Sequence, residues 1–147
     1  MKKLLKILRI IFSLSLLLSL YILISAHSYA NAVSNDLSTA VFRLHVIANS
    51  DSSEDQSLKL KVRDNLLEYM NSISSECKTK ADAIKLAEEN IDIFKQIAQK
   101  TIMENGCNYP INISIGNFYF PTKFYGDISL PSGYYDALKV EIGEAKG

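Results

Sequence analysis

The sequence predicts an α+β domain in which two helices pack on one face of a small, mostly antiparallel sheet. Apolar residues alternate with polar ones in segments that begin near residues 41, 109 and 134 of the 147-residue chain, which is typical of half-buried strands. Between the first two segments, apolar residues recur at every third or fourth position, as they do along helices. We therefore predict one two-layer domain at residues 41–147, with the element order β-α-α-β-β-β.

A first helix should begin just after the strand VFRLHVIA at residues 41–48. Ser53 and Gln56 stand in capping-box register, and Asp51 with Glu54 offers an alternative start. The helix should bury a stripe of five residues with helical spacing: Leu58, Val62, Leu66, Tyr69 and Ile73.

A second helix should run from a cap at Thr79 to a stop at Asn105-Gly106. Beyond it, Tyr109–Ile115 has the period-two pattern of a strand. Lys123–Tyr125 should form a short aromatic strand, and YYDALKVEI, residues 134–142, should form the last one.

Residues 1–30 have the order of features found in an export signal. Basic residues come first, the apolar run Ile10–Ala26 follows, and small residues in SYANA would allow cleavage after Ala30 or Ala32. The apolar run has 17 residues, the lower limit for a membrane-spanning helix, so an uncleaved signal anchor is the alternative. In both cases we expect membrane contact through this segment, a linker at residues 31–40, and a domain exported across the membrane.

The charge balance argues against nucleic acid as a partner. The first 30 residues hold four of the 16 basic residues and no acidic ones, which leaves 12 basic and 16 acidic residues in the exported part. A mildly acidic domain without a basic stripe lacks the charge that neutralises phosphates.

The sequence predicts neither a metal site nor a cofactor. Cys77 and Cys107 with His27 and His45 lack the spacing of zinc ligands, and His27 lies in the signal. The sequence has no Gly-rich phosphate loop. The two cysteines would lie in an oxidising compartment, where they could form a disulfide or stay as two free thiols.

The stretch FRLHVIANSDSSED, residues 42–55, holds the only histidine of the exported part, His45. One hypothesis is therefore an extracytoplasmic hydrolase that uses His45 with one of the serines that follow it. The nucleophile elbow G-x-S-x-G is absent, however. Ser53, Glu54 and Asp55 are also explained by a helix start, where the helix dipole stabilises negative charge. We therefore predict no catalytic residue and no enzyme activity.

Three blocks of this sequence resemble the stage II sporulation protein R family of endospore-forming Firmicutes. They are RLHVIANSDSSEDQSLKLKVRDNLL, FPTKFYGD and LPSGYYDALKVEIGEAKG, and all three fall within residues 41–147. The first block is distinctive, because a strand that ends in HVIANSD is closely followed by EDQ and a KxxVRD helix.

The resemblance implies a developmental signal rather than an enzyme. Members of this family are made in the forespore, exported into the space between the forespore and mother-cell membranes, and trigger a membrane-embedded aspartic protease. That protease processes the inactive precursor of sigma-E and so couples forespore to mother-cell transcription. The resemblance therefore implies this protease as the partner, through contact that favours its active state.

We expect partner contacts at the motif residues that local structure explains least. These are Arg43, His45, Asn49, Ser50, Asp51, Arg63, Asp64, Tyr125, Gly126 and Asp127. Family members continue beyond GEAKG into a tryptophan-rich tail that contains cysteine, whereas this sequence has no tryptophan and ends at Gly147. We therefore expect a domain that lacks this C-terminal tail.

Overall fold

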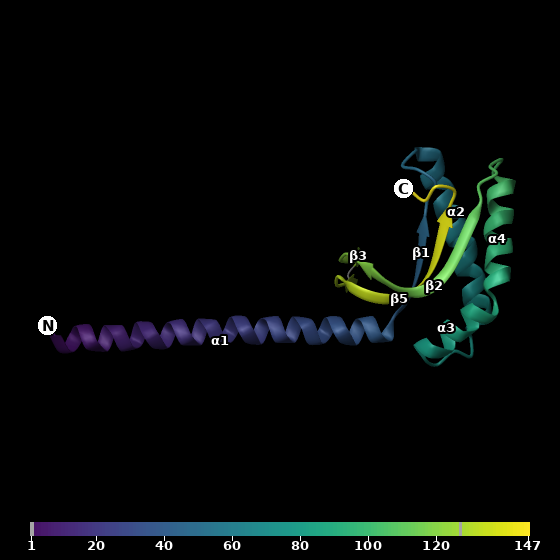
Figure 1. The fold of residues 1–147 in the computed structure, drawn as a ribbon. Coiled ribbons are helices and arrows are strands. Elements are labelled where there is room, and N and C mark those ends of the chain that lie inside the picture. Colours follow the sequence, from purple (N-terminus) through teal and green to yellow (C-terminus); the bar gives the residue numbers. More distant parts are fainter. Residues whose placement is uncertain (1, 127) are drawn as a thin grey trace. The chain divides into compact units, whose positions relative to one another are not determined.

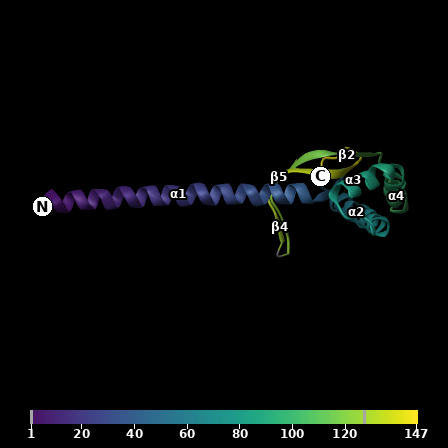
Figure 2. The ribbon, with the colours of Figure 1, turned by 90° about the horizontal axis from the view of Figure 1, so that it is seen from below.

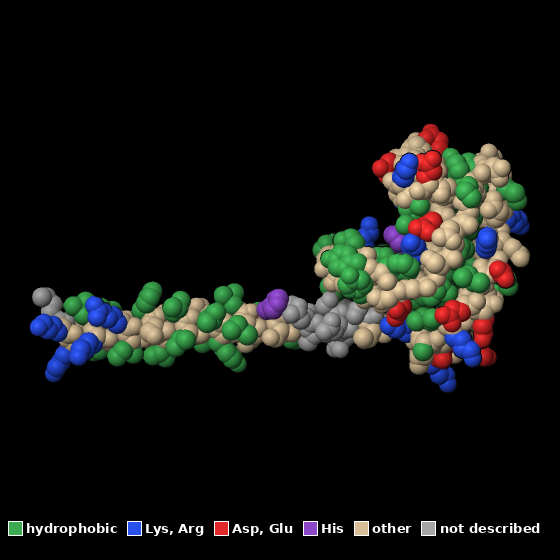
Figure 3. Space-filling view, in the orientation of Figure 1, with side chains coloured by type: hydrophobic (Ala, Val, Ile, Leu, Met, Phe, Trp, Pro, Cys, Tyr) green, Lys and Arg blue, Asp and Glu red, His purple; other side chains and the backbone are tan. Residues whose placement is uncertain are grey.

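The computed structural model describes residues 2–126 and 128–147, without the side chains of residues 30–38 and 128. The chain divides into two compact units, Met1–Leu37 and Ser38–Gly147, each of which is described by itself. Helix α1, Lys2–Ala40, forms the first unit and continues through the residues expected as a linker. Its Lys2–Tyr29 part is long and apolar enough to cross a membrane, a property that signal sequences share. Figure 3 shows hydrophobic side chains along this helix and Lys and Arg side chains near its N-terminal end.

The described residues of the second unit form three helices and five strands, which confirms the predicted α+β class. Its elements are β1 (Phe42–Ile47), α2 (Ser53–Ile73), α3 (Lys80–Glu89), α4 (Ile91–Glu104), β2 (Ile111–Phe120), β3 (Lys123–Tyr125), β4 (Ile128–Leu130) and β5 (Gly133–Ile142). The main sheet has the order β1-β5-β2, and β3 with β4 forms a separate antiparallel pair. Figures 1 and 2 show this pair projecting from the ends of β2 and β5, away from the helices.

The sheet is mixed, which corrects the prediction of a mostly antiparallel one. Strand β5 pairs antiparallel with β2 and parallel with β1, so the last strand lies between the other two. The central place of β5 explains why Ala137, Leu138 and Val140, from both of its faces, are buried. The prediction also missed β4, a three-residue strand with too few positions to show alternation.

Strand β2 is longer than expected. The prediction ended it at Ile115, because glycine is depleted in strands, but the strand continues through Gly116 to Phe120. A Cβ atom at Gly116 would lie 3.3 Å from the Phe118 ring, so that ring covers the site where a side chain is missing. This extension places Phe118 and Phe120 in the sheet, paired with Tyr135 and Gly133 of β5.

Three helices rather than two cover one face of the sheet, because the second predicted helix breaks at Asn90. The Asn90 side chain donates a hydrogen bond to the Leu86 carbonyl oxygen (2.8 Å) and accepts one from the Tyr69 hydroxyl (2.9 Å). Asparagine side chains compete in this way with the backbone bonds of a helix, and here the competition divides α3 from α4.

The start of α3 agrees with the prediction, and the start of α2 differs from it. Thr79 caps α3 in a capping box with Asp82, as expected. Helix α2 is capped by Ser52, whose hydroxyl oxygen accepts from the Asp55 amide, and not by Ser53. The cap lies one residue earlier because Ser52 has the extended backbone that an N-cap requires.

The main core lies between the sheet and the three helices. It contains the predicted stripe residues Leu58, Val62 and Leu66, all 5% exposed or less. The other fully or largely buried members come from α3, α4, β2 and β5: Ala87, Phe94, Ala98, Ile102, Ile111, Leu138, Val140 and Ile142. These residues gather because each element buries one apolar face against the others.

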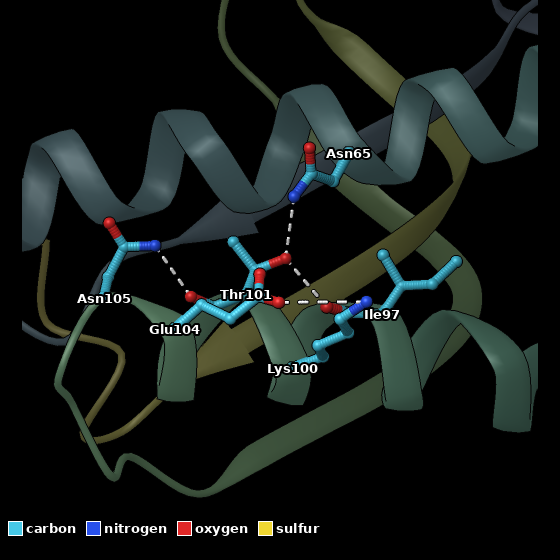
Figure 4. A network of polar contacts seen from close by, with 6 residues as sticks. All are labelled: Asn65, Ile97, Lys100, Thr101, Glu104 and Asn105. Atoms are coloured by element: carbon cyan, nitrogen blue, oxygen red, sulfur yellow. Dashed lines mark hydrogen bonds and ion pairs between the residues drawn. The ribbon is translucent and has the colours of Figure 1, made fainter.

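A polar network ties α2 to α4 beside this core (Figure 4). The buried Thr101 hydroxyl accepts a hydrogen bond from the Asn65 amide (2.8 Å) and donates one to the Ile97 carbonyl oxygen (2.8 Å). Asn105 donates to the Thr101 carbonyl oxygen (2.8 Å), and Lys61 of α2 donates to the Asn105 side chain. The buried Thr101 hydroxyl therefore has partners on both helices, which avoids the cost of an unmade bond.

We expect Leu66→Ala to lower the free energy of unfolding by about 2 to 5 kcal/mol, because it leaves a cavity in the core. Leu60→Ala is the matched control on the same helix, since Leu60 is 44% exposed, and it should change stability by about 0.5 kcal/mol or less. Urea titration of the full chain in detergent micelles, followed by tyrosine fluorescence, measures both. Equal losses for the two variants would contradict the packing described.

Candidate functional site

The polar residues that follow β1 converge on one carboxylate, that of Asp55. Its Oδ2 atom accepts hydrogen bonds from the Asn49 side-chain amide (2.9 Å) and from the Ser50 hydroxyl (2.6 Å). Asp55 is only 7% exposed although it lies in the first turn of α2. Gln56 adds a bond from its side-chain amide to the Ser50 carbonyl oxygen (2.9 Å). We call Asn49, Ser50 and Asp55 the Asp55 corner.

Hydrogen bonding sets the charge state of the Asp55 corner. Bonds from Ser50 and then Asn49 lower the pKa of Asp55, because they stabilise the ionised form. The Asp55 carboxylate in turn raises the pKa of Tyr109, which stays a neutral phenol. The corner therefore holds one fixed negative charge that polar donors surround.

The C-terminal residues fold back onto the same corner. The Glu144 amide donates to the Asn49 side-chain oxygen (3.0 Å), and the Lys146 amide donates to the Asn49 carbonyl oxygen (3.3 Å). Ala48 and Gly147 exchange two backbone hydrogen bonds of 3.0 and 3.2 Å. The GEAKG segment, residues 143–147, therefore covers the corner, and we call it the cover.

Gly143 begins this turn because no other residue fits there. Its φ is +61°, which L-residues rarely adopt, and a Cβ atom would lie 2.1 Å from the Asn49 side-chain oxygen. The Ala145 amide then closes the turn onto the Ile142 carbonyl oxygen (3.1 Å).

Arg43 lies on the face of the sheet that the helices leave uncovered. Its guanidinium carbon stands 4.0 Å from the centre of the Phe120 ring and 4.9 Å from that of Tyr135, so the cation is stacked against two aromatic faces. Its Nη1 atom is buried and has no hydrogen-bond partner among the described residues. Phe120, Tyr135 and Ala137 form a second, smaller core cluster beneath it.

His45 lies next along the same face and is half-buried. Its ring meets Phe120 edge-on at 5.1 Å. Burial and then the positive charges of Arg43, Lys139 and Lys59 lower the pKa of His45, while Glu141 acts in the opposite direction. His45 therefore stays neutral at neutral pH.

The structure does not assemble a serine triad from these residues. Within residues 2–126 and 128–147, no hydrogen bond joins His45 to a serine or to a carboxylate. The Ser50 hydroxyl is already donated to Asp55. The interpretation of Asp55 as a simple helix-start charge also needs correction, because Asp55 is the shared acceptor of the corner.

The other expected contact residues lie in three separate places. Asp51 is exposed beside the corner, and Arg63 pairs with Asp64 at 2.7 Å on the exposed side of α2. Tyr125 is 54% exposed on β3, and Gly126 follows it with a φ of +59°. Asp127 lies outside the described residues.

Sequence patterns did not indicate Asp55 as the acceptor of the corner, Tyr109 and Gly143 as its neighbours, or Phe120 and Tyr135 as the partners of Arg43. The spacing S-x-x-D of Ser52 and Asp55 was the available signal for the cap. The aromatic contacts had no local signal, because they join residues far apart in the chain. Cys77 and Cys107 are both free thiols in the structure.

The sequence profile of stage II sporulation protein R matches residues 38–147, which include every residue of the Asp55 corner and its cover. The chain belongs to the stage II sporulation protein R family. It is 31% identical over 105 residues to the stage II sporulation protein R of Bacillus subtilis (strain 168), which covers 71% of this chain. The match spans about half, 47%, of that curated relative. No solved structure matches the chain.

Gly143→Ala should destabilise the domain by more than Gly106→Ala does. Both glycines have positive φ, but a Cβ atom would clash only at Gly143, whereas Gly106 has open space around it. We expect a loss of about 1 kcal/mol for the backbone strain at Gly106, and a larger loss at Gly143. Urea titration measures the free energy of unfolding of both variants. An equal loss would contradict the predicted clash between a side chain at residue 143 and Asn49.

The Asp55 corner should also make stability depend on pH. A carboxylate whose pKa is lower in the folded than in the unfolded state stabilises the fold above its ordinary pKa. That stabilisation is lost as the pH falls through the folded-state pKa. Asp55→Asn should therefore be less stable than the parent at neutral pH and lose less stability on acidification.

Unfolding in urea at several values between neutral pH and about pH 3 measures this dependence. Asp51→Asn is the control, because Asp51 is exposed and lies outside the network. It should follow the parent curve. Identical slopes for Asp55→Asn and the parent would exclude the carboxylate as the source.

Proposed function

We propose that this chain is an exported sporulation signal that activates a membrane-embedded aspartic protease. In this proposal the protease processes pro-sigma-E and so couples forespore transcription to mother-cell transcription. The domain acts in the space between the two membranes, either released from α1 or held by it. Membership of the stage II sporulation protein R family, over residues 38–147, is the observation that carries the proposal.

Two structural features support an export-and-contact role. The Lys2–Tyr29 part of α1 has the length and apolar composition of a membrane-crossing or signal segment. Helices α2, α3 and α4 also leave one face of the sheet uncovered, and there Arg43 stacks on Phe120 and Tyr135 while His45 meets Phe120 edge-on. We assign partner contact to this face, where charged and aromatic groups are combined as they are in interfaces.

The expected contact residues then divide into two roles. The side chains of Asn49 and Ser50 make hydrogen bonds within the domain, so we propose that they hold the shape of the contact surface rather than touch the partner. Arg43, His45 and the exposed Tyr125 are the ones that we propose touch the protease. Because a ligand activates only when it binds the active state preferentially, loss of these contacts should weaken activation rather than the fold.

The test is co-expression of the chain with the sporulation protease and pro-sigma-E in a non-sporulating host. We expect cleavage of pro-sigma-E only when the chain is present. A chain that lacks residues 2–29 should fail to activate, because its domain stays on the wrong side of the membrane. Equal cleavage with and without the chain would refute the proposal.

A further inference from the structure

The backbone register fixes which groups of β1 face away from the sheet. The Gly143 amide donates to the Pro110 carbonyl oxygen (2.9 Å), so the odd-numbered residues of β5 direct their backbone groups toward β2. The even-numbered residues of β5 therefore face β1. Because Val140 stands opposite Val46 in a parallel pair, it bonds to the residues on either side of Val46.

It follows that the backbone N–H and C=O groups of the odd-numbered residues of β1 bond to β5. The backbone groups of the even-numbered residues, Phe42, Leu44 and Val46, point away from β5. They form an edge that faces no other strand of the described chain. An edge strand of this kind is a template for another strand.

The chain itself shows that the edge accepts a strand. Ala48 is the next even-numbered residue, and its outward N–H and C=O groups are the ones that bond to Gly147. Reciprocal bonds between two residues are the mark of an antiparallel pair. The pairing stops at Ala48, so three outward positions of β1 remain.

A groove runs beside the same edge on the helix side. Its volume is about 480 Å³, within the range of ligand sites. Phe42 and Leu44 line it from β1, and Leu66, Leu67 and Met70 line it from α2. Asn71, Lys78 and Thr79 add polar groups to its lining. A strand added to β1 would direct every second side chain toward the apolar wall of this groove, because residues opposite each other in a sheet share a face.

The remaining side chains of an added strand would meet positive charge. They would lie beside Arg43 and His45 on the uncovered face. Arg43 makes no ion pair within the described residues, and its Nη1 atom has no hydrogen-bond partner there. The Lys139 charge nearby is already paired with Glu141 at 2.8 Å.

We propose that the outer edge of β1 is an acceptor for an extended segment of a partner protein, with apolar residues alternating with acidic ones. The segment lies antiparallel to β1 and bonds to Phe42, Leu44 and Val46. Its apolar side chains lie in the groove, and its acidic side chains meet Arg43 on the uncovered face. The inference rests on the proposed function only for the assignment of that segment to the protease.

The probe is the labelled peptide acetyl-Glu-Val-Glu-Leu-Glu-Val-amide, added to the full chain in detergent micelles. We expect fluorescence anisotropy to report binding, and replacement of all three Glu by Lys to weaken it by about tenfold or more. A central proline in the peptide should abolish binding, because proline cannot donate to the added ladder.

Amide hydrogen exchange by NMR locates the peptide. In the free chain the amides of Phe42, Leu44 and Val46 should exchange faster than those of Arg43 and His45, which β5 protects. The peptide should slow the first three only. Protection elsewhere, or equal binding of the Lys peptide, would overturn the proposal. Protection of these three amides in the free chain that is lost on dilution would also overturn it, since the occupant would then be a second copy.

Leu67→Glu and Leu60→Glu form a matched pair on α2, with the two leucines 40% and 44% exposed. Only Leu67 lines the groove, so only Leu67→Glu should lose peptide binding. The same pair in the co-expression assay separates the two proposals. Normal cleavage of pro-sigma-E with Leu67→Glu would show that the protease is not the partner of this edge. Cleavage in the absence of the chain would refute the proposed function, but peptide binding would still be evidence for the acceptor site.

Discussion

The buried carboxylate of Asp55 is the point at which four parts of the domain meet. It accepts hydrogen bonds from the residues that leave β1, it belongs to the first turn of α2, and it lies beside Tyr109 at the approach to β2. Through Asn49 it also holds the backbone of the C-terminal turn. Removing such a shared acceptor would leave several donors unsatisfied at once. We therefore expect the corner to control both the stability of the domain and the position of the C-terminal turn beside β1.

On the uncovered face of the sheet, contacts with aromatic rings hold a charged side chain in place. Arginine is weakly hydrated and can stack on aromatic rings, so Arg43 is held by Phe120 and Tyr135 without a carboxylate partner. Its charge therefore stays available to a ligand. Burial, and after it the charge of Arg43, lowers the pKa of His45, so the histidine on this face stays neutral.

Local patterns predicted the class, the α2 stripe and the Thr79 cap, because each depends on residues close together in sequence. They did not predict the parallel pairing of β1 with β5, since alternation is identical in parallel and antiparallel strands. Nor could they distinguish Asp55 from an ordinary helix-start acid. Its role depends on Asn49 and Ser50 turning back toward it, and that turn is fixed by contacts with residues almost a hundred positions away.

The position of β5 between β1 and β2 has a consequence for the order in which the sheet can form. Strand β5 follows both of its neighbours in the sequence, so β1 and β2 have no shared partner until β5 is available. Contacts between segments this distant in sequence form late and slowly. The ordered edge of β1 therefore depends on the strand that is made after all the others, and it cannot exist on a chain that stops short of β5.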